Sequence, residues 1–260
     1  MVERIDKSAN QSTQVAFQII EVMAAAGETM RVTDLARQLG MPKARIYRFL
    51  QTLVAIGYVV QDAETERYRL TLKLFHLGQA IADGTQLITV ARPELIRLRD
   101  VTGQTTTLSV LEEQGMRVID IVRTDSPVQI VTKPGALLAF HASAQGKLAL
   151  AFGPARLWDI VRAGPLEAVT AATKTDLAQL EGEIAQVRTQ GWAVAPSEIL
   201  PGVNAISAPI LDAAHSMIGS INIAGPVQTV RPEPDAAQLA AVLGAGRTIS
   251  ISLGCTEYVG

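Results

Sequence analysis

The chain has 260 residues, of which 48% are hydrophobic and 18% charged, so a disordered or highly charged chain is excluded and one or two domains with real cores are expected. Its 23 Lys and Arg against 25 Asp and Glu exclude a uniformly basic nucleic-acid coat, although not a local basic surface. The single cysteine, Cys255, excludes an internal disulfide framework, and the first residues lack the apolar stretch of a signal peptide. We therefore expect a soluble cytoplasmic protein without a membrane span.

Three helices and a hairpin are predicted at the start of the chain. Apolar residues recur at helical spacing over residues 15–26. Thr33 is typical of the N-cap of a second helix, which Gly40 ends, and Pro42 is typical of the first position of a third helix. Two strands joined by a polar turn are predicted over residues 58–70. This order is that of a winged helix-turn-helix, which we assign to residues 1–72.

The outward face of the third predicted helix is basic. Opposite its apolar stripe, that face carries Lys43, Ala44, Arg45, Tyr47, Arg48 and Gln51. Arg and Lys can bind guanine and neutralise phosphates, Gln can pair with adenine, and Ala leaves room for a thymine methyl group. On the hairpin, Arg67 and Arg69 are expected to contact the flanking backbone or the minor groove. A solvated basic face on an ordinary helical bundle is the alternative, but the complete helix–turn–helix–wing order favours DNA binding.

The rest of the chain predicts a linker helix over residues 73–92 and an α+β domain over residues 93–260. Thr173 and Asp176 form a capping-box signature for a helix that Gly191 ends. Strands are predicted over residues 105–111, 117–122, 203–211 and 217–223, and a last helical pattern over residues 239–249. The strands fall into two hairpins, so an antiparallel sheet with flanking helices is expected.

Ordered motifs over almost the whole length resemble the IclR family of bacterial transcriptional regulators. The N-terminal motifs are Leu35-Ala36, Gly40-Met41-Pro42-Lys43, Tyr47-Arg48-Phe49-Leu50-Gln51-Thr52-Leu53 and Gly57-Tyr58. The C-terminal motifs are His141-Ala142-Ser143-Ala144-Gln145-Gly146-Lys147, Gly191-Trp192, Glu198, Gly202-Val203, Ala208-Pro209 and Gly225-Pro226. The resemblance implies a winged-helix DNA-binding domain, a linker helix and a GAF-like effector domain. It further implies a homodimer or homotetramer on operator DNA that responds to a small-molecule effector, with no cofactor.

The resemblance also places an effector pocket. In relatives that sense small oxoacids such as glyoxylate, the ligand contacts correspond here to Ala144 and Gln145, Ala195 or Pro196, Ala205, Asn222 and Ala224. Pro196, Ala205 and Ala224 have no side-chain hydrogen-bonding group, so we expect a larger, more apolar effector, an aromatic or branched carboxylate. Backbone amides near Ala144–Gly146 could hold its acid group, and Asn222 could orient it through one hydrogen bond.

Several alternatives stay open at this point. His141 is either an effector contact or a structural histidine that ties a loop to the sheet. No metal-ligand spacing and no GxSxG motif is present, which counts against a metal site and against a hydrolase. An enzyme acting on a small metabolite, with an N-terminal module used only for assembly, is one competing function, and an architectural DNA-binding protein without a ligand is another. Repression or activation depends on where the operator lies relative to the promoter.

Overall fold

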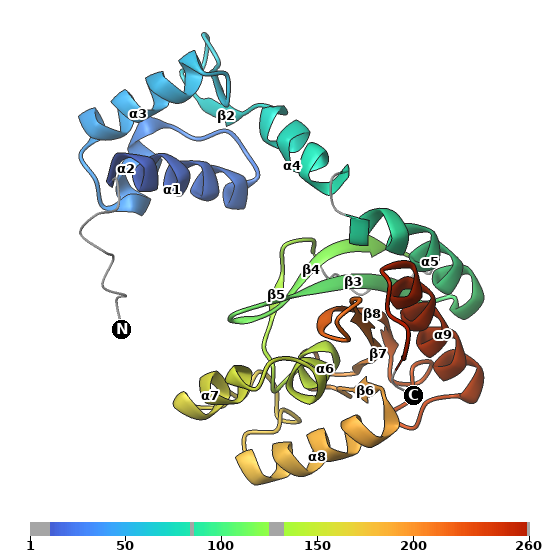
Figure 1. Ribbon diagram of the computed structural model, residues 1–260. Helices are drawn as coiled ribbons and strands as arrows, with labels where there is room; N and C mark the ends of the chain where they lie inside the picture. Colours follow the sequence, from blue (N-terminus) through green and yellow to red (C-terminus); the bar gives the residue numbers. More distant parts are fainter. Residues whose placement is uncertain (1–10, 84–85, 125–132, 259–260) are drawn as a thin grey trace. The chain divides into compact units, whose positions relative to one another are not determined.

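The computed structural model describes residues 11–83, 86–124 and 133–258. The chain divides between residues 84 and 85 into two compact units, which are described separately below (Figure 1).

The N-terminal unit is a winged helix-turn-helix, as the sequence predicts. Its elements are α1 (Gln11–Ala26), α2 (Val32–Leu39), α3 (Lys43–Ala55), β1 (Val59–Gln61), β2 (Tyr68–Leu70) and α4 (Lys73–Asp83). The two strands pair antiparallel, with Val60 opposite Arg69. Buried side chains at helical spacing, among them Ile19 of α1 and Ile46 and Leu50 of α3, form one core with Tyr68 of the wing. Burying each such side chain contributes about 1.5–3 kcal/mol, which holds the three helices together.

Two helix starts differ from the prediction. Thr33 was expected to cap α2 but lies inside it, because the helix begins at Val32 and Arg31 takes the cap position without a side-chain hydrogen bond. Pro42 is the cap of α3 rather than its first residue: its backbone is extended, with ψ of 137°, and its carbonyl accepts the amides of Arg45 and Ile46. Gly40 ends α2 as predicted, in the left-handed conformation that glycine adopts most easily.

The C-terminal unit is built on an antiparallel sheet. Within the described residues its strand order is β5-β4-β3-β8-β7-β6. The strands are β3 (Thr105–Glu112), β4 (Gly115–Val122), β5 (Leu137–Leu138), β6 (Ala193–Val194), β7 (Val203–Leu211) and β8 (Met217–Pro226). The helices are α5 (Gln86–Thr102), α6 (Ala144–Phe152), α7 (Arg156–Ala163), α8 (Leu177–Gln190) and α9 (Ala236–Ser252). The α+β prediction, with an antiparallel sheet and flanking helices, is therefore confirmed.

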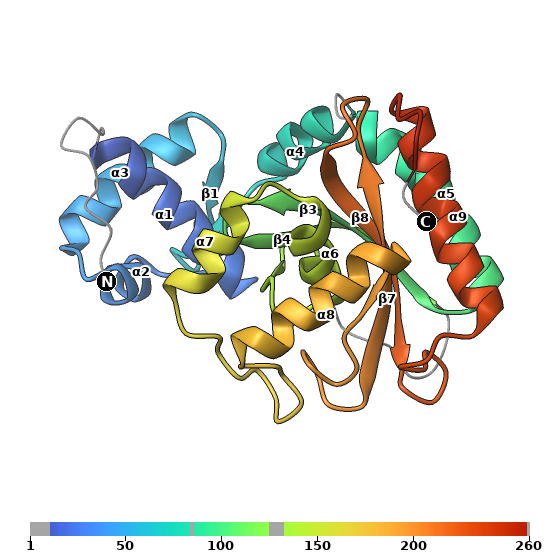
Figure 2. The same ribbon diagram turned by 60° about the horizontal axis from the view of Figure 1, so that its bottom comes forward.

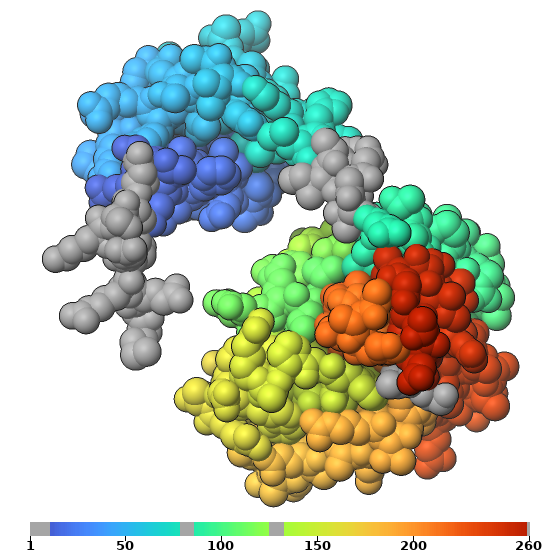
Figure 3. Space-filling model, in the orientation of Figure 1, coloured from blue at the N-terminus to red at the C-terminus, as the bar shows by residue number. Residues whose placement is uncertain are grey.

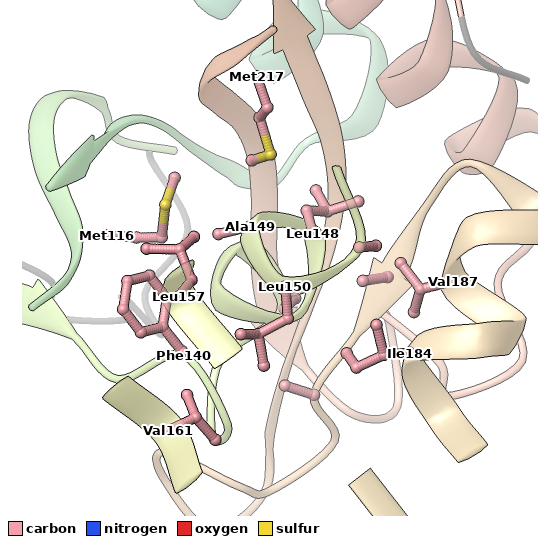
Figure 4. Packing of buried hydrophobic residues seen from close by; sticks show 14 of the residues in the cluster. Met116, Phe140, Leu148, Ala149, Leu150, Leu157, Val161, Ile184, Val187 and Met217 are labelled. Atoms are coloured by element: carbon pink, nitrogen blue, oxygen red, sulfur yellow. The ribbon is translucent and has the colours of Figure 1, made fainter. Parts of the chain in front are cut away.

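Helices cover both faces of this sheet. Helices α5 and α9 pack on one face, while α6 lies on the other and is backed by α8 (Figure 2). On the face of this unit that Figure 3 shows, the side chains of α7, α8 and α9 form much of the surface. Residues 144–151 of α6 are all buried, which is the pattern of a helix enclosed by its domain. Leu148 and Leu150 of α6 lie among Met116, Phe140, Leu157, Ile184, Val187 and Met217 (Figure 4).

The segment predicted as a linker helix contains parts of two helices. Its first half forms α4, residues 84–85 lie outside the described residues, and its last residues are the first turns of α5. The helix α5 continues through Pro93, although a proline there removes one helical hydrogen bond. The buried stripe of Leu87, Ala91, Leu95 and Leu98 offsets that loss, because it packs α5 on the sheet and α9. The division of the chain at residues 72 and 92 stays a prediction.

The capping box predicted for α8 is wrong, because it places the N-cap at Thr173 and Asp176 three residues into the helix. Asp176 is the N-cap, and its Oδ1 accepts the Gln179 amide at 2.8 Å. Thr173 is instead buried, and its hydroxyl donates to the Glu198 carbonyl at 2.7 Å. Over the described residues, no helix is long and apolar enough to cross a membrane, and no group of three His, Cys, Asp or Glu side chains could hold a metal ion.

Candidate functional site

The basic face of α3 is accessible in the N-terminal unit. Lys43, Ala44, Tyr47, Arg48 and Gln51 are exposed, and Arg45 is half-buried. In the part of the chain that the structure describes, none of the ion pairs involves Lys43, Arg45 or Arg48. These cations are therefore available to a polyanion, whereas the opposite side of α3 is fixed in the core by Ile46, Leu50 and Leu53.

The two wing arginines differ in their surroundings. Arg69 is exposed on β2, opposite Val60. Arg67 is half-buried, and its Nη1 donates to the Thr29 carbonyl at 3.1 Å, so this guanidinium fastens the wing to the loop after α1. Arg69 thus fits the expected role in contacting a nucleic-acid backbone better than Arg67.

A cavity of about 240 Å³ opens in the C-terminal unit, between the start of α6 and the sheet. Its lining comes from the first turn of α6, strands β3, β5, β7 and β8, and the segment between β6 and β7. The lining residues are Thr107, Leu138, Ser143, Ala144, Gln145, Ala195, Ile199, Leu200, Val203, Asn204, Ala205, Asn222 and Ala224. Most of these side chains are apolar and none is charged, so the cavity suits an apolar molecule with few polar groups.

Most of the predicted effector residues come together in this cavity. Ala144, Gln145, Ala195, Ala205, Asn222 and Ala224 all line it. Gly146 does not: its amide donates to Ser143 Oγ at 3.0 Å, and a Cβ atom there would lie 2.5 Å from the carbonyl oxygens of Ala139 and Phe140. The sequence therefore needs a glycine at this position for packing, because α6 approaches the preceding backbone so closely.

His141 also lies outside the cavity lining. It is buried, and its Nε2 lies 2.9 Å from the Glu167 carbonyl, far along the chain. This contact fits a structural role for His141 rather than an effector contact, but the ring ties its loop to another loop and not, as expected, to the sheet.

The sequence did not predict seven of the lining residues. They are Thr107, Leu138, Ser143, Ile199, Leu200, Val203 and Asn204. Ser143 carried a signal, because serine is a preferred N-cap and stands directly before Ala144, where backbone amides were expected to hold an acid group. The others come from strand ends and a loop whose place in space no local pattern reveals.

The N-terminus of α6 offers a place for an anion. The Ser143 side chain caps the helix by accepting the Gly146 amide, which leaves the Ala144 and Gln145 amides in the first turn without helical partners. Both residues line the cavity, and the helix dipole adds partial positive charge at this end. A carboxylate can bind there without a cationic side chain.

Two asparagines line the cavity, and they differ in what their amide groups still offer. Asn204 is fully used: its Oδ1 accepts the amides of Ala195 and Ala205, and its Nδ2 donates to two backbone carbonyls. Asn222 donates from Nδ2 to the Thr107 carbonyl at 3.1 Å and to the Thr107 hydroxyl at 3.0 Å. Its Oδ1 is buried and has no hydrogen-bond partner among the described residues.

A buried ion pair joins two segments that line the cavity, the start of α6 and the residues after β6. Lys147 of α6 is completely buried, and its Nζ donates to Glu198 Oε1 at 2.6 Å, to Glu183 Oε1 at 2.9 Å and to the Val194 carbonyl at 3.2 Å. Burial raises the pKa of the Glu198 carboxyl, and the neighbouring Lys147 ammonium opposes this shift without cancelling it. Lys174 holds the other oxygen of Glu183 at 2.6 Å.

This pair fixes the segment that carries part of the cavity wall. Glu198 directly precedes Ile199 and Leu200, which line the cavity. Ser197 has a left-handed backbone, with φ of 59°, which costs a non-glycine residue roughly 1 kcal/mol or more. The Thr170 hydroxyl donates to the Ser197 carbonyl at 2.6 Å, and the Ser197 amide donates to the Val203 carbonyl at 2.7 Å. The wall is therefore held in a defined conformation.

The described residues assemble no catalytic set in this cavity. The one cysteine lies elsewhere, next to a base that the sequence did not reveal: Cys255 Sγ is 3.8 Å from His215 Nδ1. Its thiol donates to the Glu257 carbonyl at 3.2 Å, and it is buried. A thiol enclosed in the protein, with its hydrogen directed at a carbonyl, is a poor nucleophile. The arrangement can bind a small molecule and has no groups placed to convert it.

A winged helix with a free basic face and a second unit with an apolar cavity together define a ligand-responsive DNA-binding regulator. Two family models match the chain: the IclR helix-turn-helix domain over residues 12–63 and the bacterial transcriptional regulator IclR C-terminal domain over residues 79–251. The chain belongs to the IclR family of bacterial transcriptional regulators.

Named relatives agree with this assignment. The HTH-type transcriptional regulator BhcR of Paracoccus denitrificans is 30% identical over 98% of this chain and 91% of its own length. A crystal structure of an IclR regulator from Silicibacter matches with a TM-score of 0.77 and 27% identity, over 94% of this chain and 97% of that one. An IclR homologue from Microbacterium hydrocarbonoxydans, complexed with 4-hydroxybenzoate, has the same fold, with a TM-score of 0.83, 22% identity, and 94% and 99% coverage. The chain is thus a transcriptional regulator rather than an enzyme.

Proposed function

We propose that this regulator binds operator DNA through the basic face of α3 and responds to an aromatic or other apolar carboxylate bound in the cavity. The observation that carries the proposal is the combination of a helix N-terminus with an uncharged, largely apolar lining in one cavity. The N-terminus suits an acid group, and the lining suits an apolar body. The 4-hydroxybenzoate held by the Microbacterium homologue is a molecule of this class.

The effector acts on DNA binding through a difference in affinity. If it binds one arrangement of the effector domains more tightly than another, it shifts the population towards that arrangement and alters the spacing of paired recognition helices. Paired half-sites require at least two copies of the chain, so we propose a homodimer or homotetramer that controls a catabolic operon. Light scattering of the purified protein, alone and with operator DNA, measures the number of copies.

The DNA-binding surface is tested by gel-shift titration against the DNA that flanks the gene. Arg48→Ala and Arg45→Ala should each weaken binding and lower the dependence on salt concentration by about one counterion, because each side chain faces a phosphate or a base. Arg156→Ala removes an exposed arginine from α7 and serves as the matched control, with unchanged affinity expected. Unchanged affinity in both α3 variants would remove this helix from the groove.

The effector site is tested by its response rather than by DNA binding alone. Asn222→Phe fills the cavity from β8, so it should suppress the change in operator affinity that a bound carboxylate causes and leave the basal affinity intact. Normal induction of this variant would contradict the placement of the effector.

A further inference from the structure

Tyr68, in the second strand of the wing, has a buried hydroxyl group without a hydrogen-bond partner among the described residues. It is one of the largest fully buried side chains, with 1% of the residue exposed. Buried polar atoms are rarely left unpaired, because each gives up its water on folding. Phenylalanine would fill the same space without this loss, so packing alone does not account for a tyrosine here.

The backbone of Tyr68 is fixed along both of its edges. On one edge it lies opposite Gln61 of β1. On the other edge its amide and carbonyl exchange hydrogen bonds of 2.8 and 2.9 Å with Met30, just before α2. Its ring belongs to the same hydrophobic cluster as Ile46 and Leu50 of α3. The phenol oxygen therefore has a defined position relative to α3.

The Tyr68 hydroxyl group adjoins Gln51, an exposed residue on the basic face of α3. Burial raises the pKa of Tyr68, and the Gln51 side chain opposes this shift, as a hydrogen-bond donor beside the phenol oxygen does. Gln51 follows the buried Leu50 directly and lies one helical turn after Tyr47. The phenol oxygen thus lies where the core meets the face of α3 that carries the predicted DNA contacts.

A glutamine amide has more hydrogen-bonding groups than an adenine uses. When glutamine reads adenine in the major groove, its oxygen accepts one hydrogen bond and one of its two N–H groups donates another. The second N–H group then needs an acceptor of its own once the duplex has displaced water. An acceptor in a fixed position also lowers the conformational entropy that the side chain loses on binding.

We infer that Tyr68 is a positioning residue for Gln51: its hydroxyl oxygen accepts the second amide hydrogen of Gln51 while the rest of the amide reads adenine in the operator. This inference rests on the proposed function, that the basic face of α3 binds DNA. The phenol oxygen itself touches neither base nor phosphate, because it is enclosed by the protein. Its effect falls on the choice of base and not on the electrostatic part of the affinity.

Two substitutions in the full-length protein measure this coupling. The unaltered protein first selects its sites from randomised duplexes, and gel-shift titration then compares the selected duplex with versions changed at single base pairs. Gln51→Ala should lose the preference for adenine at one position of each half-site. Tyr68→Phe should reduce that preference by about three- to tenfold and leave binding to nonspecific DNA unchanged. In the Gln51→Ala background, Tyr68→Phe should have no further effect on the preference.

Tyr58→Phe is the control, because it removes a phenol hydroxyl group from the same unit, on a ring whose centroid lies 4.6 Å from the Lys73 ammonium of α4. It should leave every base preference unchanged, and melting temperatures check the fold of each variant. A damaged fold would weaken binding to all sequences alike, whereas a misplaced Gln51 changes the preference at one base pair.

Three results would overturn the inference while the proposed function stands, provided that Arg48→Ala still weakens binding. The first is a Gln51→Ala variant that keeps every base preference. The second is a Tyr68→Phe variant that keeps the preference at the Gln51 position, and the third is one that weakens binding to all duplexes equally. Failure of the unaltered protein to select any duplex would refute DNA binding itself, and the inference with it.

Discussion

Replacing Lys147 with methionine tests the buried ion pair directly. Methionine retains most of the side-chain volume and removes the charge, so the Glu198 carboxylate is left buried with no cation in contact. Both side chains are at most 2% exposed, so water offers little screening. Breaking a buried pair in this way costs about 3–5 kcal/mol at pH 8.

The second substitution separates charge from packing. In Lys147→Met combined with Glu198→Leu, no buried charge is left unpaired, because Glu183 keeps Lys174. The double variant should therefore be more stable than Lys147→Met alone, although it carries one more change. The cost of Lys147→Met should also shrink at pH 5. Without Lys147, the pKa of Glu198 rises further, and the carboxyl takes up a proton instead of remaining charged.

Urea unfolding followed by tryptophan fluorescence is a suitable assay, because both tryptophans, Trp158 and Trp192, belong to the C-terminal unit. The free energy of unfolding of this unit can thus be followed without a signal from the winged helix. A cost below about 1 kcal/mol for Lys147→Met at pH 8, or a double variant less stable than the single one, would refute the account of the pair.

Three further predictions use the same assay. Burial raises the pKa of Glu198, so protonation of this carboxyl stabilises the folded state fully below the ordinary pKa of 4.5, and that stability is lost as the pH rises through the folded-state pKa. Glu198→Gln should lack this loss. An identical dependence of stability on pH in the variant and the parent protein would contradict the raised pKa of Glu198. Gly146→Ala should destabilise by about 3 kcal/mol, because its Cβ meets backbone oxygens, whereas Gly182→Ala, with open space around it, should stabilise by about 0.5–1 kcal/mol. Asp176→Ala should cost about 1 kcal/mol through the lost N-cap, and a cost near zero would argue against that cap.

Local patterns were sufficient for most of the fold. The apolar stripes of α1 and α3, the stop at Gly40 and the strand β7 follow from side-chain periodicity and turn residues, which depend on near neighbours alone. The capping box predicted for α8 failed because of competition with a distant group. Thr173 has the sequence signature of a cap, yet its hydroxyl is used by the Glu198 carbonyl, 25 residues away. Proline is uncommon inside a helix, yet tertiary packing carries α5 through Pro93.

The candidate site was predictable only where a motif marked it. Ala144, Gln145 and Asn222 were reached through the family resemblance, and the cavity contains them. Ile199 and Leu200 were not, because their position depends on the buried Lys147 of α6, which binds Glu198 in the segment between β6 and β7. The sequence also could not show that Asn204 and Asn222 differ in hydrogen bonding, since only the three-dimensional structure shows that Asn222 Oδ1 lacks a partner among the described residues.

The winged helix and the effector unit have hydrophobic clusters that share no residue. Because no described residue belongs to the clusters of both units, the effects of substitutions in the two units on folding should add. After a gene duplication, the residues that line the cavity of one copy could change while the DNA sequence bound by its winged helix stayed the same. The two regulators could then bind the same operator and respond to different effectors.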